Sequence, residues 1–176
     1  YSLIPQSIDE EIVTENILNW VKNPDLKSDT IIYVADITNL RQNLLFLTQL
    51  TSLGIPIILL LNMSDLADCK IVDNTMLNDQ LGIYKTILFS ASKKTGLKQL
   101  KSAISELPNV KNTKHNNMVF SKQYVKMINP LSEKLKEIFK TSGAIIEQIA
   151  FSLLCNRNLL ERLKLNKEDL HEIVSI

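Results

Sequence analysis

The fold of this chain is decided by the segment Ile55-Pro56-Ile57-Ile58-Leu59-Leu60-Leu61-Asn62-Met63-Ser64-Asp65. Its apolar run is bounded by Gly54 and by a polar cluster, which is typical of a strand buried on both faces of a sheet. The polar residues follow at the carboxyl end of that strand, where α/β proteins bind their ligands. The segment therefore predicts an α/β fold with a candidate binding site at Asn62, Met63 and Asp65.

Asn62 and Asp65 form an N-x-x-D pair, whose chemistry could select one kind of purine. An ionised Asp only accepts hydrogen bonds, and the edge of guanine that carries N1–H and N2–H₂ only donates them. Adenine has an acceptor at the equivalent ring nitrogen, and a mismatched buried polar group costs roughly 1–3 kcal/mol. The alternative is structural, because Asn and Asp also favour turns and helix caps.

The residues around this strand alternate between helical and extended patterns. Helical spacing predicts four helices in the first part of the chain, at 8–23, 40–53, 74–81 and 97–107, the first of them behind a capping box. Apolar runs predict buried strands at 30–36, 57–61 and 86–89. Strands that alternate with helices favour a mostly parallel, doubly wound sheet. Three strands make about half of such a domain, so we expect a further part upstream.

Beyond Pro108 the sequence changes character. Residues 109–117 are rich in Asn and Lys and are interpreted as a linker. No strand pattern follows them, and helical spacing predicts a small all-α segment with a kink or interruption at Asn129-Pro130. We therefore predict an α/β domain at residues 1–110 and a helical domain at residues 111–176.

Composition and charge exclude several classes of function. The 176 residues carry 20 Lys and Arg against 19 Asp and Glu, and this balance argues against nucleic acid as a partner. No apolar run approaches the ~18–20 residues of a membrane span. Cys69 and Cys155 lack metal-ligand neighbours, so we expect both to be small buried hydrophobes. We predict no metal site and no catalytic residue in this chain, and the oligomeric state stays open.

Polar residues are expected at the ends of all three strands: Asp36, the Asn62 and Asp65 pair, and Ser90-Ala91-Ser92. A Ser-Ala pair after a short strand that follows an N-x-x-D motif is typical of the second base-binding element of GTPases. There the Ala backbone N–H donates to guanine O6, a position at which adenine presents a donor. The combination favours guanine recognition over a simple turn, whereas Asp36 is expected to be structural.

Three segments together carry a resemblance to a known family. Residues 1–10 are similar to the stretch that follows a D-x-x-G motif, residues 34–44 to a V-D-A-x-N-L-x-R-N-L segment, and Asn62 to Asp65 to an N-M-x-D motif. All three belong to the GTPase domain of the bacterial ferrous iron transporter B (FeoB) family, which residues 1–107 resemble. The motif is specific, because most translation and signalling GTPases carry Lys in place of Met63.

The resemblance implies a Ras-like P-loop GTPase fold, of which this chain would be the C-terminal part. The residues that would bind the guanine base of GTP or GDP are Asn62, Met63, Asp65, Ser90, Ala91 and Ser92. The residues that would belong to the second switch region are Ser2, Leu3 and Ser7. Met63 keeps an apolar contact but cannot donate as Lys would, so weaker nucleotide binding is expected. Arg41 is expected to be a solvated helix charge.

The resemblance also implies a cellular setting. Residues 111–176 would correspond to a helical domain that favours bound GDP and relays the nucleotide state. Its partner would be the membrane-embedded part of the same polypeptide. The chain would then be the guanine-nucleotide-binding portion of a ferrous iron uptake transporter, at the cytoplasmic face of the bacterial inner membrane.

The motifs that handle phosphate do not occur in the sequence. It contains no G-x-x-x-x-G-K-[ST], and no D-x-x-G precedes Tyr1. The phosphate loop and the Mg²⁺ ligands are therefore expected upstream, and this chain alone is predicted not to hydrolyse GTP. The alternative function is a degenerate, non-hydrolysing GTPase-like module for protein interactions. A GTPase of RNA or ribosome maturation is disfavoured by the neutral charge and by N-M-x-D.

Overall fold

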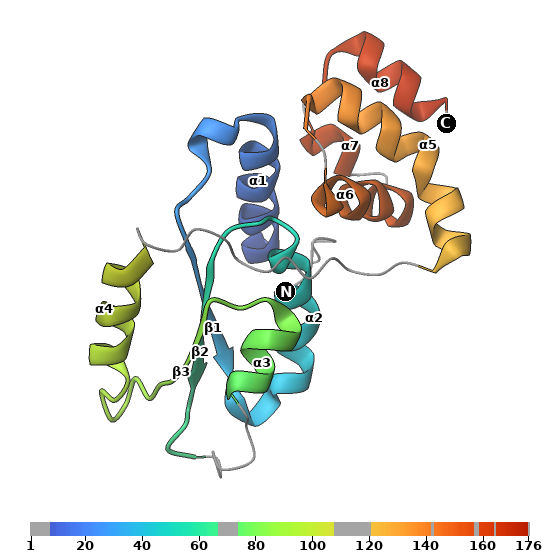
Figure 1. Cartoon of the computed structure of the whole chain (residues 1–176). Helices are drawn as coiled ribbons and strands as arrows, with labels where there is room; N and C mark the ends of the chain where they lie inside the picture. Colours follow the sequence, from blue (N-terminus) through green and yellow to red (C-terminus); the bar gives the residue numbers. More distant parts are fainter. Residues whose placement is uncertain are drawn as a thin grey trace. The chain divides into compact units, whose positions relative to one another are not determined.

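The computed structural model describes residues 8–66, 74–107, 121–141, 143–156, 159–163 and 165–175 (Figure 1). The chain divides into two units. The sheet unit is Ser28–Asn117, and the helical unit joins Tyr1–Lys27 to Met118–Ile176. The boundary that the sequence predicts between residues 110 and 111 lies outside the described residues and stays a prediction.

The sheet unit is built on three parallel strands in the order β1-β2-β3. Their bounds are Ile31–Asp36 for β1, Ile57–Asn62 for β2 and Lys85–Leu88 for β3. The apolar run of β2 is buried throughout, because this strand has a neighbour on each edge. The register sets Asp36 beside Asn62 and Leu61 beside Leu88. The predicted meeting of the three strand ends at one edge is therefore confirmed.

One face of the sheet is covered by α4, Leu97–Glu106 (Figure 1). Ile58, Leu60 and Ile87 of the sheet form a buried cluster with Ala103 of the helix. The partly buried residues packed against this cluster are Tyr84, Phe89, Leu100 and Leu107. The apolar stripe that predicts α4 from the sequence therefore meets the sheet only in part, because Leu100 and Leu107 pack against the cluster while Leu97 and Ile104 are exposed.

The opposite face carries α2 and α3, with bounds Leu40–Thr51 and Asn74–Leu81. The Tyr33 hydroxyl on β1 donates to the Asn43 carbonyl oxygen at 3.2 Å, and its ring meets Phe46 of α2 edge-on at 5.9 Å. On β3, the Thr86 hydroxyl donates to the Asn78 carboxamide of α3 at 2.6 Å. Helices on both faces confirm the predicted doubly wound architecture.

The helical unit contains five α-helices among its described residues, and its core comes from their apolar sides. Their bounds are Ile8–Lys22 (α1), Lys122–Phe139 (α5), Ala144–Cys155 (α6), Leu159–Arg162 (α7) and Lys167–Val174 (α8), with a 3₁₀ turn at Pro24–Leu26. The buried residues of α5 and α6 include Ile128, Leu131, Leu135, Ile146, Ile149 and Leu153. The interruption considered at Pro130 is not found, because α5 runs through it as one helix.

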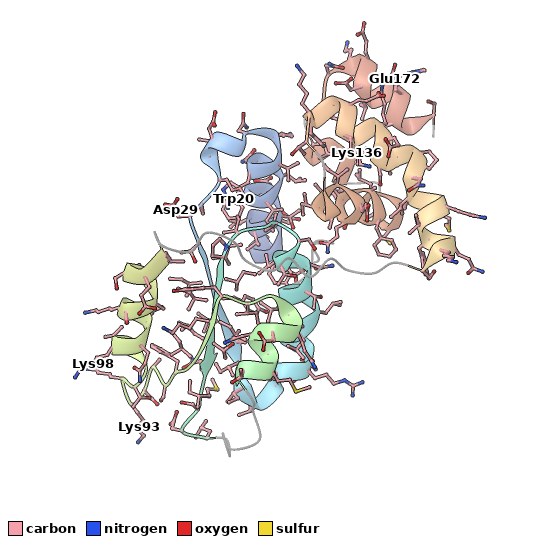
Figure 2. The ribbon with its side chains drawn as sticks, viewed as in Figure 1. Trp20, Asp29, Lys93, Lys98, Lys136 and Glu172 are labelled. Carbon is pink, nitrogen blue, oxygen red and sulfur yellow. The ribbon has the colours of Figure 1, made fainter. Side chains whose placement is uncertain are left out.

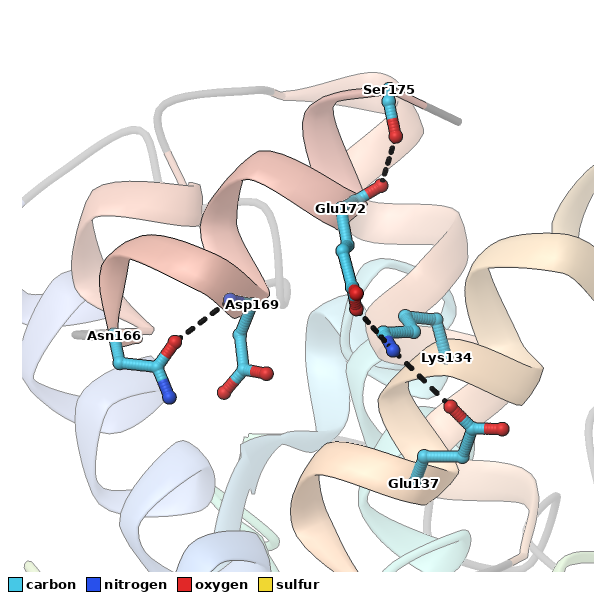
Figure 3. Close-up of polar contacts among 6 residues, drawn as sticks. All are labelled: Lys134, Glu137, Asn166, Asp169, Glu172 and Ser175. Carbon is cyan, nitrogen blue, oxygen red and sulfur yellow. Dashed lines mark hydrogen bonds and ion pairs between the residues drawn. The ribbon is translucent and has the colours of Figure 1, made fainter.

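Polar contacts attach α8 to the rest of the helical unit (Figure 3). The Lys134 ammonium on α5 pairs with Glu172 of α8 and, at 3.3 Å, with Glu137 of its own helix. α8 begins at a side-chain cap, since the Asn166 carboxamide oxygen accepts the Asp169 backbone N–H at 2.7 Å. The ion pair joins α8 to α5, and the cap stabilises the beginning of α8 itself.

Two further sequence expectations concern the helical unit. Within the described residues, no single helix is long and apolar enough to cross a membrane; α5 and α6 pass that test only as a pair bent by 120°. Cys155 was expected to be buried, but this expectation is wrong, because the thiol lies exposed at the last residue of α6. Cys69 lies outside the described residues.

Candidate functional site

The first half of the candidate site is the turn that follows β2. Asn62 ends the strand, and Met63 turns the chain with a left-handed φ of 60°. Two backbone bonds then fix the turn: Ser64 N–H donates to the Phe89 carbonyl at 3.1 Å, and Leu66 N–H donates to the Met63 carbonyl at 2.9 Å. The turn is therefore attached to the chain that leaves β3.

The second half is the loop between β3 and α4. Ser90 and Thr95 close it through a pair of backbone hydrogen bonds of 3.3 and 3.1 Å. Lys94 and Gly96 complete the turn with φ values of 55° and 87°. A side chain at Gly96 would place its Cβ 2.6 Å from the Leu88 carbonyl oxygen, so the loop lies directly on the strand end.

Side chains join the two halves. The Asn62 carboxamide oxygen accepts the Ala91 backbone N–H at 3.1 Å, and the Ser92 hydroxyl donates to Asp65 Oδ2 at 3.3 Å. Ser90 and Ser92 share a hydroxyl–hydroxyl bond of 3.0 Å. The structure thus brings together the six residues that the sequence selected as base-binding, which are Asn62, Met63, Asp65, Ser90, Ala91 and Ser92.

The surroundings of Asp65 lower the pKa of its carboxylate. Hydrogen bonding from the Ser90 hydroxyl is the largest cause that lowers the pKa of Asp65, and the Ser92 hydroxyl and the Lys93 charge lower it further. Desolvation is the second-largest effect and raises the pKa. Asp65 is exposed to solvent, and at neutral pH it offers acceptor oxygens only.

Asp36 and Arg41 also belong to the sheet unit, outside the two loops of the site. Asp36 Oδ1 accepts the backbone N–H and the hydroxyl of Thr38, at 2.8 and 2.7 Å, and so caps the 3₁₀ turn Ile37–Asn39. This confirms the structural role expected for Asp36. Arg41 is exposed on α2, as expected of a solvated charge.

Three predicted residues lie outside the described part of the chain, and two residues of the site were not predicted. Ser2, Leu3 and Ser7, assigned to the second switch region, lie outside the described residues. Lys93 and Gly96 contribute to the site, through charge and backbone shape respectively, but sequence reasoning did not select them. The signal available was Gly96 itself, a residue that permits positive φ, directly before an amphipathic helix.

The donor set suits a heterocyclic base rather than a metal ion. The site offers one carboxylate, one carboxamide, hydroxyls and backbone N–H groups, whereas Mg²⁺ needs several oxygen ligands in octahedral geometry. Among the described residues there is no cluster of three His, Cys, Asp or Glu that could hold a metal. These residues do not fit Mg²⁺.

Comparison with known sequences places the chain in one family. Residues 1–104 match the model of a family described as ferrous iron transport protein B. The Fe(2+) transporter FeoB of Leptospira biflexa is 31% identical over 100 residues, and that of Salmonella typhimurium is 38% identical over 100 residues. The matches cover 56% of this chain but only 14% and 12% of those relatives.

Solved structures agree over almost the whole chain. The cytosolic domain of L. pneumophila FeoB has a TM-score of 0.69 and 26% identity, covering 99% of this chain and 74% of that one. NFeoB from S. thermophilus, bound to GDP.AlF4- and K+, has a TM-score of 0.73 and 26% identity, covering 99% and 66% respectively. The fold is the α/β, Ras-like GTPase fold of these neighbours. By its sequence match and by this fold, the chain belongs to the ferrous iron transport protein B family.

Proposed function

We propose that this chain is the guanine-recognising portion of the GTPase domain of a ferrous iron transporter. The observation that carries the proposal is the bonding of Asn62 and Asp65 to the loop at Ser90-Ala91-Ser92. It is supported by the S. thermophilus structures, which are described as bound to GDP.AlF4- or to mGMPPNP. A rigid pair of loops at the strand ends is what a flat, polar base requires.

Asp65 would select guanine through its charge. Its carboxylate is ionised at neutral pH, so both oxygens are acceptors, which match the N1–H and N2–H₂ donors of guanine. Adenine would set a ring acceptor against the carboxylate, so the base would gain no hydrogen bond from it there. The loss of a charge-assisted hydrogen bond decides between the two bases.

Asn62 would read the other edge of the base. Its carboxamide oxygen is already bonded to Ala91 N–H, which leaves the carboxamide NH₂ group to donate. Guanine N7 is an acceptor and suits that donor. The Ala91 N–H would have to share its bond between the Asn62 oxygen and guanine O6. This competition, together with Met63 in place of a donor, predicts weak base binding.

Phosphate binding and hydrolysis belong, in this proposal, to residues that this sequence does not contain. The 176 residues include no G-x-x-x-x-G-K-[ST] motif, and the described site lacks a metal-binding cluster. We therefore expect no GTP hydrolysis by this chain alone. The phosphate loop and the Mg²⁺ ligands would come from an upstream portion of the same GTPase domain.

The proposed role in Fe²⁺ transport rests on membership of the ferrous iron transport protein B family. In the proposed whole protein, nucleotide binding and hydrolysis regulate Fe²⁺ transport by a membrane-embedded part of the same polypeptide. This chain would lie at the cytoplasmic face of the bacterial inner membrane, with Ser2, Leu3 and Ser7 in the second switch region. The helical unit would relay the nucleotide state. The alternative is a GTPase-like module that does not hydrolyse and acts through protein contacts.

A binding experiment on the isolated chain tests base recognition. Without phosphate contacts we expect a dissociation constant on the order of millimolar, about −4 kcal/mol, which NMR titration can follow. GDP should shift the amide resonances of Ala91 and Ser92, and ADP at the same concentration should not. Equal shifts with both nucleotides, or none with either, would contradict guanine recognition and favour the alternative module.

Asp65→Asn provides the matching variant. It should weaken GDP binding about ten-fold, by loss of a charge-assisted hydrogen bond. Binding of xanthosine diphosphate should improve relative to GDP, because the base of XDP has a carbonyl where guanine has its amino group. Asp79→Asn, at an exposed position on α3, removes the same charge as a control and should change neither. If xanthosine diphosphate gains nothing, Asp65 is not the base reader.

A further inference from the structure

The candidate base site contains two serine hydroxyls whose surroundings differ. Ser90 is buried at the end of β3, with 1% of its surface exposed. Ser92 is exposed in the same loop, and its hydroxyl oxygen lies 3.0 Å from that of Ser90 and 3.3 Å from Oδ2 of Asp65. The exposed hydroxyl therefore stands between the buried one and the carboxylate.

Counting protons orders these contacts. The Lys93 backbone N–H donates to Ser90 Oγ at 3.2 Å, while the Lys93 side chain points into solvent (Figure 2). Ser92 donates its single proton to Asp65, so the contact between the two hydroxyls must use the proton of Ser90. A chain of three hydrogen bonds therefore runs from the Lys93 backbone to the Asp65 carboxylate.

A second order of protons satisfies fewer contacts. Ser90 can donate directly to Asp65, a bond that lowers the pKa of that carboxylate, and Ser92 then donates to Ser90. This order leaves the 3.3 Å contact between Ser92 and Asp65 without a proton. The chain makes all three contacts hydrogen bonds at once, and each bond in such a chain polarises the next.

The last bond of the chain fixes the orientation of the Asp65 carboxylate. Asp65 is exposed, so hydrogen bonds rather than packing must hold the plane of its carboxyl group. A carboxylate has about four lone-pair sites, so Oδ2 can accept an N–H of the base beside the Ser92 hydroxyl. A fixed plane matters most for a two-point contact, in which both oxygens must meet two donors at the same time.

We propose that Ser92 is a positioning residue, which orients Asp65 for a purine with two adjacent donors rather than one. The inference rests on the proposed guanine recognition and adds a second level of selectivity to it. The charge of Asp65 disfavours adenine, whereas its orientation separates guanine from hypoxanthine. Hypoxanthine keeps N1–H and O6 but lacks N2–H₂, so it makes a one-point contact that tolerates rotation of the carboxylate.

Titration of the 176-residue chain with GDP and with inosine diphosphate (IDP), followed by NMR, tests the inference. Wild type should bind GDP about five-fold more tightly than IDP, the effect of one hydrogen bond. Ser92→Ala should weaken GDP binding about three-fold and leave IDP binding unchanged, so that the preference falls to about two-fold. Ser92→Thr keeps the hydroxyl and should keep the wild-type preference.

A second measurement needs no nucleotide. Ser92→Ala should raise the pKa of Asp65, because the carboxylate loses a hydroxyl donor, and carbon-13 NMR of the carboxyl group can follow this change. Ser105→Ala is the matched control, since it removes an exposed hydroxyl of α4 that donates to the Ser102 carbonyl at 2.8 Å. It should change neither the pKa of Asp65 nor the preference for GDP over IDP.

The possible failures can be told apart. Equal weakening of GDP and IDP binding by Ser92→Ala would indicate a loosened loop and would overturn the inference. An unchanged preference, or an unchanged pKa of Asp65, would overturn it as well, while binding of GDP rather than ADP by the wild type would keep guanine recognition. A wild type that does not prefer GDP to ADP would overturn the proposed function, and this inference with it.

Discussion

Backbone angles at single residues decide the shape of the candidate base site. Met63 and Lys94 adopt φ values of 60° and 55°, which non-glycine residues seldom do and which cost on the order of 1 kcal/mol each. Such angles persist where surrounding contacts impose them. The hydrogen bonds from Ser64 to Phe89 and from Ala91 to Asn62 are contacts of this kind. The site is thus held by its cross-connections rather than by local preference.

Gly96→Ala tests this dependence at one residue. The new Cβ would meet the Leu88 carbonyl oxygen at 2.6 Å and Phe89 Cδ2 at 2.8 Å, at a φ of 87° that already disfavours a side chain. We expect a loss of roughly 1–3 kcal/mol in the free energy of unfolding, measured by urea denaturation. Amide exchange should also rise in residues 90–95.

Gly143→Ala is the control, because its φ of 120° strains any side chain while no atom lies within 4 Å of the added Cβ. Its cost should come from the backbone alone, roughly 1–3 kcal/mol, because φ 120° with ψ 176° is a conformation essentially confined to glycine. Amide exchange in residues 90–95 should stay unchanged in Gly143→Ala, and no rise there in Gly96→Ala would show that the loop moves freely off the strand end.

The helix α8 is too short to be stable by itself. It has eight residues, and isolated helices of that length are marginal in water. Three features compensate: the Asn166 cap, the buried Ile173, and the pairing of Glu172 with Lys134 across the two helices (Figure 3). The helix α8 is therefore stabilised in part by its tertiary contact with α5, which the local sequence does not predict.

The Lys134 and Glu172 pair can be measured by a double-mutant cycle of Lys134→Met and Glu172→Gln. The Lys134 side chain is 25% exposed and that of Glu172 is 54% exposed, so we expect a coupling energy of about 0.2–1 kcal/mol. Lys134→Met should also raise amide exchange in α8.

The neighbouring Lys136 offers the control, since it pairs with Glu133 inside α5. Lys136→Met removes the same charge and should leave exchange in α8 unchanged. A coupling energy of zero, or equal effects of the two lysine variants on α8, would show that the Lys134 and Glu172 pair does not hold α8.

For the molecule as a whole, the sequence was most informative where structure depends on local pattern. The apolar period of Ile57–Asn62 and of Leu97–Glu106 was enough to predict a buried strand, a covering helix and a parallel sheet. The residues that meet at the strand ends followed from that topology. The polar residues of the site could also be selected from the sequence, because Asn, Asp and Ser-Ala are typical of base-binding loops as well as of turns.

Long-range packing is what the sequence pattern could not supply. Nothing local indicates that Ala91 N–H bonds the Asn62 oxygen, or that α7 forms from the four residues Leu159–Arg162. The exposure of Cys155 depends on where α6 ends relative to its neighbours. The grouping of residues 1–27 with the C-terminal helices also depends on contacts between segments far apart in the chain.

Two separate cores predict two separate responses to core mutation. Ile58 in the sheet unit and Leu135 in the helical unit are both fully buried. Replacing either by Ala should cost about 2–5 kcal/mol, through lost apolar contact and the cavity left behind. If each unit opens as its own cooperative element, the loss stays in the unit that carries the mutation.

Hydrogen exchange should then show Ile58→Ala lowering protection in β1 to β3 while α5 and α6 keep theirs, and Leu135→Ala should give the reverse. The two variants control for one another, because each removes a large aliphatic side chain of equal burial. A parallel loss of protection across both units in either variant would mean that the chain unfolds as one cooperative structure.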